Sequence, residues 1–144
     1  MHLYLFTLEI APLELGHQVY DELPSHLTLM SRFLSSLPSE ELAARVQPLF
    51  ARTAPIHLVF GETKVLGPKK VTAQLHNNLR EQLDTLKVEY QYPEFIGDNH
   101  KPHVTAREGV QFTPGSKRTA SAAYLIEIID KKRVVRAKFT LSAT

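Results

Sequence analysis

The chain has 144 residues and a mass of 16.3 kDa, and 43% of its residues are hydrophobic and 22% charged. This composition is typical of one globular domain and excludes a disordered tail or a fibre. Cysteine is absent, which excludes disulfide bridges, thiol catalysis and cysteine-ligated zinc. The formal charge of +2 is divided unevenly, with −4 over residues 1–98 and +6 over residues 99–144. The basic C-terminal third fits an anionic ligand or, equally well, a solvated strand edge protected by lysines.

The longest apolar runs are far shorter than the ~20 residues of a membrane-spanning helix. The N-terminus, Met1-His2-Leu3-Tyr4, lacks the basic and apolar regions of a signal peptide. We therefore expect a cytoplasmic protein with no membrane partner, and a monomer.

Hydrophobic periodicity and turn residues predict the elements of the first half of the chain. They are a strand at 3–10, a helical turn within 15–23, a strand at 26–30, a helix at 39–52 with Ser39 as its N-cap, a strand at 56–60 and an extended run that ends at Leu66.

The second half of the chain begins with the clearest helix, whose apolar face is formed by Leu75, Leu79, Leu83 and Leu86. The following elements are predicted strands at 88–92 and 103–107 and a hairpin of 122–129 and 134–141 that turns through residues 130–133.

The two halves, divided near Thr72, have comparable contents: each has an amphipathic helix, several strands and one extended segment that contains a histidine. This similarity indicates an internal duplication. We predict one domain over residues 1–144, with pseudo-symmetric lobes at 1–72 and 73–144. The expected fold class is α/β (α+β), with antiparallel or mixed sheets flanked by helices.

The two histidine segments repeat one pattern of residue types. His26-Leu27-Thr28-Leu29 and His103-Val104-Thr105-Ala106 each run His, apolar, Thr, apolar, and a proline precedes each histidine within two residues. Side chains alternate between the faces of a strand, so each His and its Thr share one face and the apolar residues point to the buried side.

Two imidazoles and two hydroxyls that converge on a cleft suit the cleavage of a phosphodiester. In-line attack needs a base at the attacking oxygen and an acid at the leaving oxygen, and two imidazoles of ordinary pKa, near ~6.5, can supply both without a metal. The threonine hydroxyls would bond the non-bridging oxygens as negative charge develops there.

The paired motifs are similar to those of the 2H phosphoesterases, a family named for His-x-Thr-x motifs on two symmetric lobes. The family includes the RNA 2',3'-cyclic phosphodiesterases, which are also called bacterial 2'-5' RNA ligases. The resemblance spans most of the chain through the order and spacing of the motifs. It implies a duplicated bilobal fold around a central cleft, metal-free catalysis without a cofactor, an RNA or nucleotide substrate, and His26, Thr28, His103 and Thr105 as catalytic residues.

Strand parity adds two candidate substrate-binding residues. Arg107 is predicted to share the face of His103 and Thr105, where a guanidinium would hold a phosphate by paired hydrogen bonds. Counting every second residue from His26 through Thr28 assigns Arg32 to the corresponding face of the first strand. The alternative for both arginines is a solvated surface position.

Three further residues are candidates for contact with a nucleic acid. Tyr92 and Tyr124 are candidates for base stacking, and Lys117, in a predicted loop with Arg118, for a backbone phosphate. The alternatives are packing for the tyrosines and simple solvation for the lysine.

The remaining histidines lack catalytic partners nearby in the sequence. His2, His17, His57 and His76 are interpreted as ordinary strand or helix residues. His100 differs, because Asp98, His100 and His103 are conceivable metal ligands, although the loop composition favours the rim of a cleft.

The sequence therefore favours a metal-independent phosphoesterase that cleaves a cyclic phosphate or a 2',5'-type phosphodiester. The alternatives are a non-catalytic module that binds RNA or a nucleotide in the same cleft, and a scaffold in which both histidines are packed.

Overall fold

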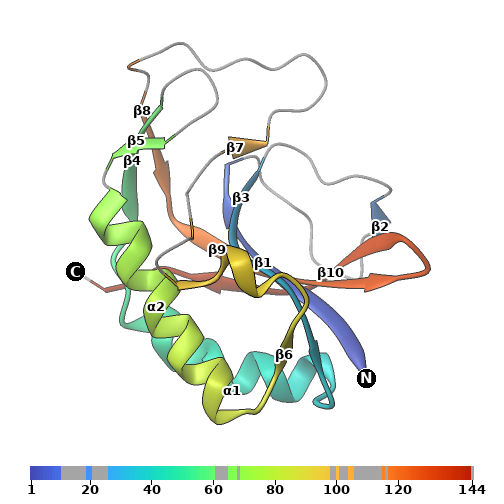
Figure 1. Cartoon of the computed structure of the whole chain (residues 1–144). Helices are drawn as coiled ribbons and strands as arrows, with labels where there is room; N and C mark the ends of the chain where they lie inside the picture. The colour runs from blue at the N-terminus through green and yellow to red at the C-terminus, as the bar shows by residue number, and fades with distance from the viewer. Residues whose placement is uncertain are drawn as a thin grey trace.

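A computed structural model describes residues 1–10, 19–20, 26–60, 65–67, 69–97, 100, 104–105, 115 and 117–143. Within these residues the chain forms a large sheet, a small sheet and two helices (Figure 1). No helix in the described part is long and apolar enough to cross a membrane. The expected α/β class, with mostly antiparallel strands and two helices, is confirmed.

The large sheet is built by strands from both halves of the chain. Its order is β2-β10-β9-β1-β3-β6, and β7 also pairs with β3. Each of these pairings is antiparallel. The strands are β1 (His2–Glu9), β2 (Val19–Tyr20), β3 (His26–Ser35), β6 (Glu89–Tyr90), β7 (Val104–Thr105), β9 (Ala122–Ile129) and β10 (Lys132–Thr140).

The small sheet has the order β5-β4-β8 and lies beyond one end of the helices (Figure 1). Its strands are β4 (Ile56–Phe60), β5 (Val65–Gly67) and β8 (Lys117–Ala120). The loop predicted at Lys117 and Arg118 is therefore wrong, because both residues pair with β4 in a strand. Elements of the two halves thus meet in both sheets, and the division into two lobes stays a prediction.

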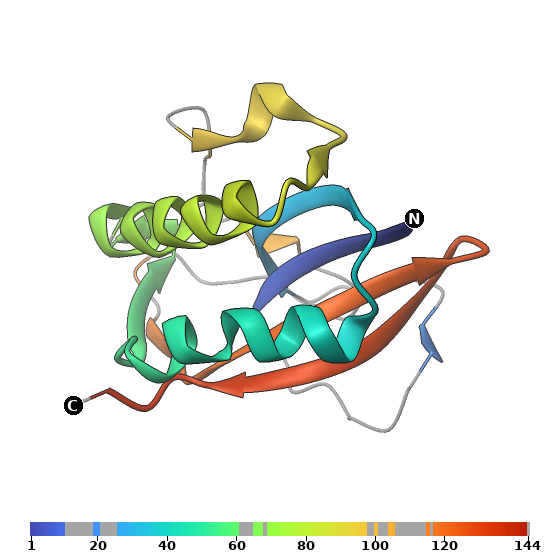
Figure 2. The same ribbon diagram turned by 90° about the horizontal axis from the view of Figure 1, so that it is seen from below.

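Both helices lie on the same side of the large sheet (Figures 1 and 2). Helix α1 (Ser39–Ala51) contacts β9 and β10, and α2 (Lys69–Thr85) contacts β3 and packs against α1. Ser39 is the first helical residue of α1 rather than its N-cap, a position held by Pro38 without a side-chain hydrogen bond.

The core lies between the large sheet and the helices, and Phe6 of β1 is at its centre. The Phe6 ring lies 5.8 Å from Phe33, 6.0 Å from Phe50 and 6.2 Å from Phe139, measured between ring centroids. Such tilted and offset ring pairs stabilise a core beyond their buried area alone. Three of the four leucines predicted for the apolar face of the second helix, Leu75, Leu79 and Leu83, are buried on it, whereas Leu86 follows the end of α2 and is only partly buried.

The predicted hairpin near the C-terminus and the predicted helical turn near the N-terminus have different outcomes. The hairpin of β9 and β10 is confirmed, and it turns at Asp130 and Lys131, which have φ of 51° and 66°. Two positive φ angles in succession are typical of the type I′ turn that fits the strand twist. The helical turn predicted within residues 15–23 is wrong at Val19 and Tyr20, which form β2 because β10 supplies hydrogen-bond partners; the flanking residues lie outside the described part.

Candidate functional site

The two His-x-Thr segments lie on neighbouring strands. In the antiparallel pair of β3 and β7, His26 is the partner of Thr105 and Leu27 is the partner of Val104. The short strand β7 lies against the N-terminal part of β3 in Figure 1. Segments 77 residues apart in the chain are therefore adjacent in the sheet.

The first motif has the alternation that the sequence predicts. Leu27 and Leu29 are fully buried on the helical side, whereas His26 and Thr28 are half-buried. Because successive side chains in a strand point to opposite faces, His26 and Thr28 belong to the face of the sheet away from the helices. We call this the open face, to distinguish it from the helical face.

The partners of these two residues on β1 are polar. Glu9 is opposite His26, and Thr7 is opposite Thr28. Directly opposed residues of an antiparallel pair share a face and have Cβ atoms about 4.5–5.5 Å apart. No motif in the sequence singles out Glu9 or Thr7, although alternation along the first strand assigns both to the face opposite Leu8.

Glu9 is the centre of a polar cluster with Tyr124 and Lys138. The Tyr124 hydroxyl donates a hydrogen bond to Glu9 Oε2. Lys138 Nζ lies 3.8 Å from the same oxygen and 5.9 Å from the centroid of the Tyr124 ring. The carboxylate next to His26 is therefore balanced by an ammonium group and held by a hydroxyl.

Thr7 lies between Thr28 and Tyr124 in the cross-strand register. It is fully buried, and its Oγ1 has no hydrogen-bond partner among the residues that the structure describes. A buried hydroxyl without a partner costs about 1–3 kcal/mol, so a native structure that keeps one needs a reason for it, such as a functional role.

The second motif is described only by the backbone of Val104 and Thr105. His103 and Arg107 lie outside the described residues, so their predicted roles stay predictions.

Arg32 is half-buried, and its carbonyl oxygen accepts a hydrogen bond from the backbone N–H of Gln91. The pairing of β3 with β1 shifts register twice between Thr28 and Phe33. Each extra residue on β3 interrupts the alternation of faces. The two extra residues together leave the parity of the count unchanged, so the register does not contradict a place for Arg32 on the open face, and its role stays a prediction.

Of the other three candidate binding residues, Tyr124 lies near His26, because its hydroxyl bonds Glu9, the cross-strand partner of His26. Tyr92 is 40% exposed, and its ring lies 6.2 Å from that of Phe95 in the 3₁₀ turn Pro93–Phe95. Tyr124 is on the open face but fully buried, in an apolar cluster that includes Leu5. Lys117 is exposed on the small sheet, opposite Val59.

The conceivable metal site is not assembled in the described part of the chain. The His100 ring stacks on His76, with centroids 3.9 Å apart and an interplanar angle of 2°. Asp98 and His103 lie outside the described residues, and within those residues no three His, Cys, Asp or Glu side chains could hold a metal ion.

His76 is buried and both of its ring nitrogens are used. Nδ1 donates to Leu29 O at 2.7 Å, and Nε2 accepts the Gly97 N–H at 2.9 Å. This pair of bonds requires the neutral imidazole with its proton on Nδ1. Burial is the largest cause and lowers the pKa of His76. The hydrogen bond to Leu29, the second cause in size, raises this pKa in part, and the charge of Arg80 lowers it.

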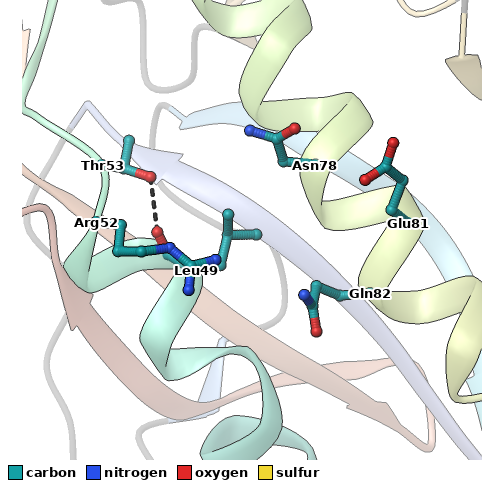
Figure 3. A pocket seen from close by; sticks show the side chains of 6 residues that line it. All are labelled: Leu49, Arg52, Thr53, Asn78, Glu81 and Gln82. Atoms are coloured by element: carbon teal, nitrogen blue, oxygen red, sulfur yellow. Dashed lines mark hydrogen bonds between the residues drawn. The ribbon is translucent and has the colours of Figure 1, made fainter.

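A polar groove of about 280 Å³ lies between the C-terminal end of α1 and the middle of α2 (Figure 3). Arg52, directly after α1, and Gln82 of α2 line it, and Thr53 next to Arg52 donates a hydrogen bond to Leu49 O at 2.8 Å. Because both helices cover the face opposite His26, this groove is separate from the paired motifs.

Comparisons with solved structures identify the fold. LigT of E. coli complexed with NADP+ aligns with a TM-score of 0.58 and 19% identity, over 98% of each chain. A phosphoesterase structure aligns at 0.55 and 18%, and E. coli LigT complexed with 3'-AMP at 0.52 and 16%, again over 98% of both chains. No curated protein matches the sequence.

The family model described as "2'-5' RNA ligase superfamily" matches residues 6–143, nearly the whole chain. This match includes both His-x-Thr segments and the strands that carry them. The predicted relationship to the 2H phosphoesterases is thereby confirmed, and the chain belongs to the 2'-5' RNA ligase superfamily.

Proposed function

We propose that this protein is a metal-independent phosphoesterase that cleaves a 2',3'-cyclic phosphate or a 2',5'-phosphodiester of RNA or a nucleotide. The observation that carries the proposal is the antiparallel pairing of His26 with Thr105 and of Leu27 with Val104. The family supports an enzyme of the phosphoesterase or ligase type, and solved relatives complexed with NADP+ and 3'-AMP favour a nucleotide ligand.

The proposed catalytic residues are His26, Thr28, His103 and Thr105. In the backbone register, Thr105 is opposite His26, so the threonine of the second motif lies beside the histidine of the first. One imidazole takes a proton from water or a ribose hydroxyl, and the other gives a proton to the leaving oxygen. The hydroxyls donate to the non-bridging phosphate oxygens as negative charge develops on them.

Arg107 is proposed to hold the phosphate, because it lies two residues beyond Thr105 in a strand-like sequence and guanidinium groups bind phosphate by two parallel hydrogen bonds. The basic C-terminal third supplies further positive charge for an anionic substrate. We expect the enzyme to act as a cytoplasmic monomer.

The test is incubation with nucleoside 2',3'-cyclic phosphates and 2',5'-linked oligoadenylates in the presence of a chelator. The His26→Ala/His103→Ala double variant is the blank. Conversion of the cyclic substrate to one phosphate regioisomer by the wild type alone is the expected result. The contradicting result is RNA binding without turnover, which persists when both histidines are lost and weakens steeply with salt. That result would show a non-catalytic RNA-binding module instead of an enzyme.

A further inference from the structure

The side chain of His76 joins the two parts of the chain that carry the paired motifs. Its Nδ1 donates to the carbonyl oxygen of Leu29, the residue directly after Thr28. Its Nε2 accepts from the N–H of Gly97, six residues before His103. One imidazole on α2 therefore contacts the first motif and the segment that leads to the second.

The contact with the first motif uses an irregularity of β3. In the register with β1, Thr28 pairs with Thr7 and Met30 pairs with Phe6, so Leu29 is an extra residue. An extra residue in a strand is left out of the ladder of hydrogen bonds. The bond from His76 Nδ1 satisfies the Leu29 carbonyl, and it does so next to a proposed catalytic hydroxyl.

The contact with the second segment is held by a turn. Gly97 has φ of +73°, and its carbonyl oxygen accepts the N–H of His100 at 3.0 Å. The His100 ring then lies flat against the His76 ring at 3.9 Å. Three residues lie between His100 and Val104, where pairing with β3 begins, so among the described residues this turn is the last attachment before the second motif.

We propose that His76 is a positioning residue, whose neutral imidazole fixes the second motif relative to the first by joining Leu29 to Gly97. This inference rests on the proposed function for its catalytic consequence, but its structural part does not. It gives a role to a histidine that the sequence pattern assigns to an ordinary helix position.

The test compares His76→Ala, His76→Gln and the control Leu79→Ala. Leu79 is a buried residue on the same helix, one turn further, and its truncation destabilises the fold without removing the Leu29 and Gly97 bonds. Glutamine has a neutral donor and a neutral acceptor on one amide, so it can replace both bonds of the imidazole.

The first measurement is amide hydrogen exchange, which needs no substrate. We expect His76→Ala to accelerate exchange in residues 97–105 relative to Leu79→Ala, and we expect His76→Gln to restore much of the protection. Equal exchange in these residues for His76→Ala and Leu79→Ala would overturn the inference. If His76→Ala does not fold, His76→Asn replaces it, because its shorter amide can reach only one of the two partners.

The second measurement separates kcat from KM on the folded enzyme. A displaced catalytic group lowers kcat, and a displacement of about 1 Å can lower the reaction rate about 100-fold. We expect His76→Ala to lower kcat by about 10-fold to 100-fold with little change in KM, and His76→Gln to recover it. A fall in kcat no larger than that of Leu79→Ala would contradict the inference. Absence of turnover by the wild type would instead contradict the proposed function, and the exchange result would still decide the role of His76.

Discussion

The two faces of the large sheet differ in chemistry although the same strands form both. On the helical face, Phe6, Phe33 and Phe139 pack in a buried aromatic cluster. On the open face, the same strands carry His26, Glu9 and other polar groups. Alternation of side chains along each strand thus places the aromatic core on one face and the polar residues around His26 on the other, beside a smaller apolar cluster that includes Leu5.

This separation makes the effects of substitution specific to each face. A change on the helical face should lower the free energy of unfolding, because it removes buried apolar contacts. A change at the proposed catalytic residues should lower the reaction rate and leave unfolding nearly unchanged. Four predictions test that contrast.

The largest expected effect is on catalysis. We expect His26→Ala to lower kcat by a factor on the order of 10²–10⁴, because a general acid or base is removed, with little change in the urea midpoint. Steady-state kinetics on a 2',3'-cyclic nucleotide measure the loss. The matched control is His57→Ala, an exposed histidine on β4 that bonds Thr119. Full activity of His26→Ala would exclude the proposed mechanism.

The next effect is on stability. We expect Phe6→Ala to lower the free energy of unfolding by about 3–5 kcal/mol, since it empties the centre of the aromatic core. Urea denaturation measures this loss. Phe95→Ala is the control, because Phe95 is 55% exposed and its removal should have only a small effect. Equal losses for the two variants would contradict the assignment of the helical face as the core.

A smaller loss is expected at the first threonine. We predict that Thr28→Val weakens transition-state binding by about 1.5–3 kcal/mol, because a hydrogen bond to a charged oxygen is removed while shape is retained. The ratio of kcat/KM for wild type and variant gives this energy. Thr119→Val, a change at an exposed threonine of β8, is the control. A value of kcat/KM equal to that of the control would remove Thr28 from the catalytic set.

The smallest effect is a pH dependence of stability at His76. Burial, its largest cause, lowers the pKa of His76 in the folded chain below the ordinary value near ~6.5. The unfolded chain therefore takes up a proton before the folded chain does as the pH falls, and stability is lost progressively below about pH 6.5. His76→Gln cannot titrate, so its unfolding free energy should fall less between pH 7.5 and 5. Parallel decreases for both proteins, measured by urea denaturation, would show that His76 does not contribute.

Long elements with regular periodicity could be predicted from the sequence. The strand that became β1, the hairpin of β9 and β10 and the apolar face of α2 all followed from spacing alone. The two-residue strand β2 could not be predicted, because only its pairing with β10 makes it a strand.

The candidate site could be predicted in part. Pattern matching found His26 and Thr28, and alternation along the strand assigned them to one face. The two register shifts after Thr28 could not be seen in the sequence, and the role of Arg32 stays a prediction. Glu9 and Thr7 were missed because their relevance depends on which strand pairs with β3, and pairing partners distant in the chain are not encoded in local spacing.

The central claim is that two imidazoles act on one phosphorus, one as base and one as acid. The most direct test is the dependence of kcat/KM on pH for the wild type acting on a 2',3'-cyclic nucleotide, with a chelator present. Because one imidazole must be neutral and the other protonated, we predict a bell-shaped profile with one limb on each side of the optimum. A profile that is flat, or that has a single limb between pH 5 and 9, would contradict the claim.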